Sequence, residues 1–335
     1  MTDSYFSIQY LRGLAALMVV LLHLSTGGFF PQSAATEWLG GGVDIFFVIS
    51  GFIMVKSTQG KTYSPKQFYV KRIMRIVPLY WLATLVTVQA SGWTGWHSIA
   101  SFLFIPMQHP TDAVFLPVLQ PGWTLNYEMF FYLIFGASLL LPEKNRLIWL
   151  GAGLALLVMG GIIFQPTGVA GFYLNPIILE FVCGMIIAKS RRKMPIIVVP
   201  LALFFMPLLC GLTDQRFFSL GLPAMLLVWG IISAEPKMPE IRAFSLVGDA
   251  SYAIYLFHPL VLGTAQIFIT GEPGKSIWLV LVVLMATIAF GVMAHLFLEK
   301  PFSLFLSDWM YKYRKKQGDD GASKTSQKQL QNEIT

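Results

Sequence analysis

Charged residues are scarce in this chain of 335 residues. Asp, Glu, Lys and Arg together make up 12% of it, whereas hydrophobic residues make up 55% and the mean hydropathy is +0.64. Soluble globular domains carry about 25% charged residues, so this composition excludes an ordinary soluble enzyme or binding domain. The chain is predicted to be an integral membrane protein.

Cysteine is almost absent as well. The chain has two cysteines, Cys183 and Cys210, and both fall inside apolar stretches, where they are expected to be packing residues. This usage excludes a disulfide framework and a cysteine-rich metal centre, and no metal cofactor is expected. The sequence also lacks an internal repeat, which argues against a transporter built from two similar halves.

Apolar stretches long enough to cross a bilayer recur along the chain. A helical crossing needs about 20 apolar residues. The candidate stretches are 8–28, 41–56, 73–91, 122–141, 147–164, 172–188, 195–212, 217–233, 246–267 and 276–298. They predict an all-α, polytopic membrane protein with about ten transmembrane helices. Segment 98–106 is expected to lie in the interface or to re-enter the membrane.

The basic residues predict the orientation of these helices. If the N-terminus is cytoplasmic, the 24 Lys and Arg residues all fall on the cytoplasmic side except Arg216 and Lys275, as the positive-inside rule requires. The C-terminus is then cytoplasmic too. Nucleic-acid binding is not expected, because the basic residues lie at helix ends. A cleaved secretory signal is disfavoured, because only Arg12 precedes a long apolar run.

Two parts of the chain differ in composition. Residues 1–306 read as one membrane domain, and 307–335 as a polar cytoplasmic tail that is expected to be disordered. The basic segment 311–316, YKYRKK, is expected to contact anionic membrane lipid. The segment 299–301, EKP, predicts the end of the last membrane helix. Any chemistry must then occur among the helices, because no soluble catalytic domain is present.

The apolar segment YLRGLAALMVVLLHLS carries two ionisable residues, Arg12 and His23. Eleven helical residues rotate about 1100° and rise about 16 Å, so the two side chains share one face, with Arg12 at the cytoplasmic end. Each has a simpler explanation alone, because Arg12 can snorkel to the surface and His23 can be a packing residue. Their common face favours a shared cavity.

A pair of arginines opens the third stretch, KRIMRIVPLYW. Arg72 and Arg75 are spaced i, i+3 and therefore share a face, where two guanidinium groups can bind phosphate. The alternative is ordinary anchoring at the cytoplasmic boundary, which does not explain why Arg75 lies inside the apolar run.

Other polar residues lie deeper in the apolar stretches. Glu128 is expected at the depth of His23, where its carboxylate can orient the imidazole and stabilise its charged form; alone, it would be protonated. Asp44 follows three glycines and either faces the cavity or lies at a close helix contact. His258 precedes Pro259 and either lines a site or bonds a neighbouring helix.

These segments together resemble the acyltransferase-3 family of membrane O-acyltransferases, especially the short members that modify bacterial exopolysaccharide. The resemblance spans about residues 8–302. It depends on LRGLAALMVVLLH, GGGVDIFFVISGF, KRIMRIVPLYW, PGWTLNYEMFFYL, SYAIYLFHP and FLEKPF in that order. Each segment alone is a weak signal, whereas six in order are specific.

The resemblance implies a ten-helix enzyme of the bacterial inner membrane. Such enzymes move an acyl group, commonly acetyl, from cytoplasmic acyl-CoA to a hydroxyl of a glycan or a lipid-linked sugar. The family's Arg-x10-His element corresponds to Arg12 and His23, its RxxR element to Arg72 and Arg75, and its acidic residue to Glu128. Many relatives have a serine-rich segment where this chain has TLNY, which leaves open the group that binds the oxyanion.

The positions of the charged residues support an acyl-CoA-dependent enzyme without the resemblance. Coenzyme A bears phosphates at one end and a thioester at the end of a long arm, so a cationic mouth with a base about 16 Å deeper matches its shape. Asn126, Tyr127, Asp44 and His258 are further candidates to line the site. A transporter of a small polar or anionic solute and a non-enzymatic scaffold are the alternatives. The acceptor and a homo-oligomeric state stay open.

Overall fold

The computed structural model describes residues 6–61, 64–93, 95–109, 114–235, 238–268 and 277–316. Within these ranges the chain forms helices and no strand, so the all-α prediction is confirmed there. The α-helices are α1 (Phe6–Thr26), α2 (Ala34–Glu37), α3 (Gly41–Thr58), α4 (Pro65–Ser91), α5 (Trp96–Phe102), α6 (Gly122–Ser138), α7 (Glu143–Phe164), α8 (Gly168–Tyr173), α9 (Leu179–Lys189), α10 (Val198–Cys210), α11 (Leu222–Ala234), α12 (Arg242–Asp249), α13 (Ser251–Phe268), α14 (Ile277–Ala294) and α15 (Lys300–Lys316).

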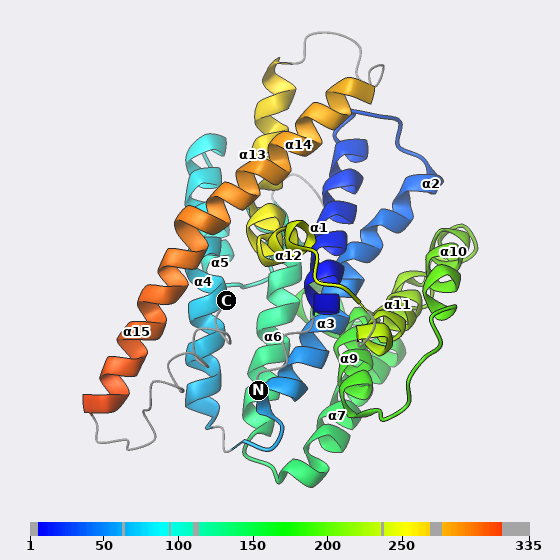
Figure 1. Ribbon diagram of the computed structural model, residues 1–335, viewed down its shortest axis with the longest axis vertical. Helices are drawn as coiled ribbons and strands as arrows, with labels where there is room; N and C mark the ends of the chain where they lie inside the picture. The colour runs from blue at the N-terminus through cyan, green and yellow to red at the C-terminus, as the bar shows by residue number, and fades with distance from the viewer. Residues whose placement is uncertain are drawn as a thin grey trace.

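Helices α1 and α3 lie at the centre of this bundle (Figure 1). Helix α1 packs against α3, α12 and α13, and α3 packs most extensively against α9. Helices α14 and α15, orange to red in Figure 1, form a long tilted rod on one side, while α7, α9, α10 and α11 gather on the other. The elements that hold the polar residues are therefore surrounded by apolar helices.

Helix α4 shows why the arginine-bearing segment is helical. Ser64 caps its N-terminus, since its side-chain oxygen accepts a hydrogen bond from the backbone N–H of Gln67 at 3.2 Å, and Pro65 at the first helical position has no N–H to leave unpaired. Gly92, with φ of +67°, ends the helix in the left-handed conformation that glycine favours. This continuous helix holds Arg72 and Arg75 on one face.

Glycine allows α3 and α9 to touch through their backbones. A Cβ atom on Gly51 would lie 2.0 Å from the carbonyl oxygen of Phe181, and one on Gly184 would lie 2.0 Å from that of Val48. Both distances are far below any allowed contact, so only glycine fits. Small residues at such crossings are typical of helices packed in membranes. This contact buries α3 almost completely.

The prediction of about ten transmembrane helices is not confirmed. By length and composition, the described residues contain six helices able to cross a membrane, or seven if the pair α12 and α13, bent by 66°, counts as one. The other predicted stretches form helices of 17, 11 and 13 residues, namely α6, α9 and α10. Hydropathy measures apolar length, whereas Pro176 starts a separate 3₁₀ turn that shortens α9.

The helix end predicted at 299–301 is wrong. Helix α14 continues through a π-helical turn, His295–Glu299, directly into α15. Pro301 lies at the second position of α15, where the altered hydrogen-bonding of the π turn accommodates a residue without an N–H. The predicted domain boundary at 306 therefore falls inside a helix. Residues 317–335 of the predicted tail and Lys275 lie outside the described residues, and the orientation stays a prediction.

The glycine contact generates a test of stability. Gly51→Ala should lower the free energy of unfolding by about 3 kcal/mol, because the added methyl group meets a backbone carbonyl that cannot rotate away. Gly153→Ala on α7 is the matched control, since no atom lies within 4 Å of the point that its Cβ atom would occupy. It should leave stability unchanged or raise it by up to about 1 kcal/mol. Thermal unfolding in detergent measures both, and equal midpoints would contradict the close contact.

Candidate active site

A cavity of about 100 Å³ lies between α1, α3, α4, α6 and α13. By volume it has room for roughly eight water molecules or a narrow chain segment. Its polar lining comprises Arg12, Ser50, Arg72, Arg75, Thr124, Glu128, Tyr132, Ser251, Tyr252 and Tyr255. Four of the residues expected to form the site, the three arginines and Glu128, are therefore brought together from three separate helices.

The three arginines make this cavity cationic. Arg12 and Arg72 are 7% and 5% exposed, and Arg75 is half-buried. Only one acidic side chain, Glu128, lies among the lining residues. The guanidinium group of Arg72 lies 5.9 Å from the ring of Tyr132, a distance at which a cation is attracted by the face of an aromatic ring. Such a concentration of buried positive charge favours an anionic ligand.

Glu128 is held in place by two hydroxyl groups. Ser50 donates a hydrogen bond to Oε1 of Glu128 at 3.1 Å, and the hydroxyl of Tyr132 donates to the same oxygen. These two hydrogen bonds fix the orientation of the Glu128 carboxyl group beside the arginines that line the cavity.

The two histidines lie together rather than with Glu128. The ring centroids of His23 and His258 are 4.8 Å apart, and neither residue lines the cavity. Tyr255 joins the two regions, because it lines the cavity while its carbonyl oxygen accepts a hydrogen bond from Nδ1 of His258 at 2.7 Å. The face of α1 that carries both Arg12 and His23 therefore lines the cavity at Arg12. The outer part of the same face, with His23, contacts α13.

The expected hydrogen bond between His23 and Glu128 is not present among the described residues. His23 lies three residues before the end of α1, whereas Glu128 lies six residues after the start of α6. At 1.5 Å per residue, level helix ends would leave them about 5 Å apart in depth. The prediction counted residues from the ends of the apolar stretches and therefore missed this difference in depth. Ser50 and Tyr132 bind Glu128 where the imidazole was expected.

Asp44 belongs to a different polar cluster. Its Oδ2 atom accepts a hydrogen bond from Nη2 of Arg216 at 2.6 Å, and Glu180, completely buried, interacts with both residues. Asp44 is not among the residues that line the cavity. Of the two predictions for Asp44, the close helix contact therefore matches its position. The pair also explains how Arg216, a predicted outer residue, is tolerated.

Asn126 and Tyr127, also expected to line the site, point elsewhere. The hydroxyl of Tyr127 donates to the carbonyl oxygen of Phe172 at 2.5 Å, and its ring stacks on that of Phe172. Asn126 is 2% exposed, and neither residue lines the cavity. On α6 the cavity is lined instead by Thr124, Leu125, Glu128 and Tyr132.

Two residues that contact Glu128 were not predicted from the sequence. Tyr132 lies four residues after Glu128 and therefore on the same helix face, a signal that could have found it. Ser50 comes from α3, and no local pattern connects it with α6. Within the described part of the chain, no group of three or more His, Cys, Asp or Glu side chains is placed to hold a metal ion.

Comparison with known proteins decides the family. A family model described as an acyltransferase domain, Acyl_transf_3, matches residues 5–296. The chain belongs to the acyltransferase-3 family. This acyltransferase is 38% identical over 302 residues to the exopolysaccharide production protein ExoZ of Rhizobium meliloti, covering 82% of this chain and 91% of that protein. It is an enzyme of the membrane, as its apolar helices require.

More distant relatives of this acyltransferase span nearly the same length of chain. The acyltransferase MdmB of Streptomyces mycarofaciens is 26% identical over 88% of this chain and 90% of its own. The peptidoglycan O-acetyltransferase OatA of Listeria monocytogenes is also 26% identical over 88% of this chain, which corresponds to 55% of OatA. No solved structure matches.

The Asp44–Arg216 pair predicts a particular pattern of stability. Arg216→Leu should cost about 3 kcal/mol, because it leaves the Asp44 carboxylate buried without its cation. Adding Asp44→Asn should restore most of the loss. Arg191→Leu, at an exposed position, is the control and should change stability by less than about 0.5 kcal/mol. Thermal unfolding measures all three, and a double variant as unstable as Arg216→Leu would contradict the pairing.

Proposed function

We propose that this acyltransferase moves an acetyl group from cytoplasmic acetyl-CoA to a hydroxyl of an exopolysaccharide, another cell-surface glycan or its lipid-linked precursor. The observation that carries the proposal is the cavity in which Arg12, Arg72 and Arg75 surround Glu128. Free coenzyme A enters only from the cytoplasm, so the enzyme would act in the bacterial inner membrane. The name of the relative ExoZ supports exopolysaccharide as the acceptor.

The arginines are proposed to bind the phosphate groups of the donor. Guanidinium groups hold phosphate oxygens through paired hydrogen bonds, and these are strongest where water is scarce. With the nucleotide held at the arginines, the pantetheine arm would extend along α1 from Arg12 toward His23, about 16 Å further along the helix axis. Glu128, fixed by Ser50 and Tyr132, would stand beside the arm and keep the arginines apart.

His23 is proposed to be the catalytic base. Its Nδ1 atom donates to the carbonyl oxygen of Val19 at 2.9 Å, so in the neutral ring Nε2 carries a lone pair. That atom would take the proton of the acceptor hydroxyl while the hydroxyl oxygen attacks the thioester carbon. The sulfur of coenzyme A leaves and receives the proton back. The rings of Phe46 and Tyr255 contact one another at the wall of the cavity, and we expect them to move when the arm binds.

The proposed function predicts that His23→Ala abolishes transfer. Inside-out membrane vesicles from a strain lacking its own copy are supplied with radiolabelled acetyl-CoA, and label in the polysaccharide fraction is counted. Removing the base should lower the rate by about 100-fold or more, with unchanged protein level and thermal midpoint. A wild-type protein that labels no saccharide would contradict the function itself. A variant that labels normally would contradict only the role of His23.

The arginines generate a prediction about donor binding. Arg12→Ala, and Arg72→Ala combined with Arg75→Ala, should weaken coenzyme A binding by roughly 10- to 150-fold, because each lost charge-assisted contact is worth about 1.5 to 3 kcal/mol. Lysine at these positions should recover only part of the affinity, since an ammonium group lacks the planar paired donors.

The matched ligand for that experiment is an acetyl-pantetheine thioester without the nucleotide. Calorimetric titration into purified wild-type and variant proteins compares it with coenzyme A. The arginine variants should differ from wild type for coenzyme A and hardly at all for the shorter thioester. An equal loss for both ligands would mean that the arginines maintain the fold instead of binding phosphate.

A further inference from the structure

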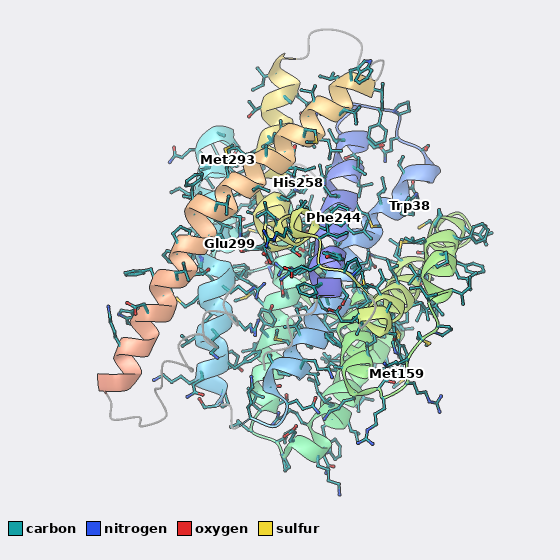
Figure 2. All side chains as sticks on the ribbon, in the orientation of Figure 1. Trp38, Met159, Phe244, His258, Met293 and Glu299 are labelled. Carbon is teal, nitrogen blue, oxygen red and sulfur yellow. The ribbon has the colours of Figure 1, made fainter. Side chains whose placement is uncertain are left out.

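His258 is a completely buried histidine whose ring contacts that of His23. The ring planes are inclined by 51° at a centroid separation of 4.8 Å. His258 is 0% exposed, whereas His23 is half-buried. Figure 2 labels His258 in the middle of the molecule, where α13 passes α1. One ring of the pair is therefore reachable, and the other is enclosed behind it.

The residue after His258 determines which of its nitrogens carries the proton. Pro259 has no N–H. The carbonyl oxygen of Tyr255, four residues before Pro259, therefore lacks its ordinary helical donor. Nδ1 of His258 lies 2.7 Å from this oxygen. A carbonyl oxygen only accepts hydrogen bonds, so Nδ1 must be the protonated nitrogen. In the neutral ring, Nε2 of His258 then carries a lone pair.

That lone pair has no partner in the resting structure. Nε2 of His258 is buried and, among the described residues, accepts no hydrogen bond. The hydrogen bond of Nδ1 stays within α13, so within the same part of the chain the imidazole does not bond its helix to a neighbour. Packing alone would be served by an apolar side chain, as it is at Ile254 and Leu262 on the same helix. Buried acceptors are normally satisfied, so this exception requires an explanation.

His23, whose ring centroid lies 4.8 Å from that of His258, has the same arrangement of its ring nitrogens. Its Nδ1 donates to the carbonyl oxygen of Val19, so its Nε2 also carries a lone pair. Two lone pairs repel one another, but one added proton on either Nε2 converts that nitrogen into a donor for the other. The pair is thus built to accept one proton and to share it.

We propose that His258 is a positioning residue that stabilises the protonated form of His23 during acyl transfer. The inference rests on the proposed function. The acceptor O–H bond breaks, its proton moves to Nε2 of His23, and the resulting N–H donates to Nε2 of His258. The oxygen forms the ester bond as the carbon–sulfur bond breaks, and the proton then passes from His23 to the coenzyme A thiolate. The imidazole of His258 thus stabilises the charged form of His23, which is the role that the sequence pattern predicted for Glu128.

Two substitutions separate this role from simple packing. His258→Gln keeps an oxygen that can accept a hydrogen bond, whereas His258→Leu fills the space without one. Vesicle labelling from acetyl-CoA should fall by about 100-fold or more for His258→Leu, and His258→Gln should retain at least about tenfold more activity than that variant. The KM for acetyl-CoA should stay within about twofold of wild type, because the defect lies in the transition state.

His97→Leu is the matched control, because His97 is also buried with both ring nitrogens unpaired and lies on α5, where its ring contacts Trp93 and His109. It should keep wild-type activity. Equal losses for His258→Gln and His258→Leu, or a raised KM together with a lowered thermal midpoint, would show a packing role and overturn the proposal. So would full activity of His258→Leu. A wild-type protein without transfer activity contradicts the proposed function instead.

A measurement on the wild-type protein tests the protonation of the ring nitrogens directly. Nitrogen NMR of ¹⁵N-histidine-labelled protein in lipid bilayers distinguishes protonated from unprotonated ring nitrogens. The chain has five histidines, so the conservative His258→Gln variant assigns the signal. We expect Nδ1 protonated and Nε2 unprotonated in both His23 and His258. A proton on Nε2 of His258 in the neutral imidazole would overturn the proposal.

Discussion

The close packing of α3 is the constraint on which the other polar contacts depend. Glycines at the crossing bring α3 and α9 into backbone contact, because a Cβ atom added at Gly51 or Gly184 would lie only 2.0 Å from a backbone carbonyl oxygen of the other helix. Helix α3 then has a fixed position from which Ser50 reaches Glu128, and Asp44, almost two turns away, reaches Arg216. A larger residue at the crossing would displace both contacts at once, because the helix moves as a rigid element.

Three clusters of polar residues in this bundle differ in how their buried charge is compensated. Asp44 and Arg216 neutralise one another, and such a pair contributes more to a defined helix arrangement than to net stability. The cavity instead keeps an excess of positive charge, with three arginines and one carboxylate, which is costly without an anion. The histidine pair holds a buried acceptor, Nε2 of His258, that has no hydrogen-bond partner among the described residues. The cavity and the histidine pair are the two clusters in which an added anion or proton would supply a missing interaction, as expected of sites that bind or react.

Much of the candidate site was predicted from sequence because its parts lie in short local patterns. The i, i+3 spacing of Arg72 and Arg75 sets their common face whatever packs against it. Depth was harder to predict. The expected pairing of His23 with Glu128 depended on the ends of the apolar stretches, whereas α1 ends at Thr26, only three residues after His23. The number of crossings stays a prediction for a similar reason, since hydropathy does not show where a helix is interrupted, as it is at Pro176 before α9.

The sequence by itself determined that this is a helical membrane protein, that arginines lie on the faces of two of its helices, and which family it belongs to. Helical periodicity and the cost of buried charge depend on the residues of a single segment, so both can be inferred from the sequence alone. Only the tertiary structure decided which polar residues meet. Asp44 joined Arg216, Glu128 joined Ser50 and Tyr132, and His23 joined His258. These partners lie mostly on different helices, and the packing of side chains over the whole bundle selects among them.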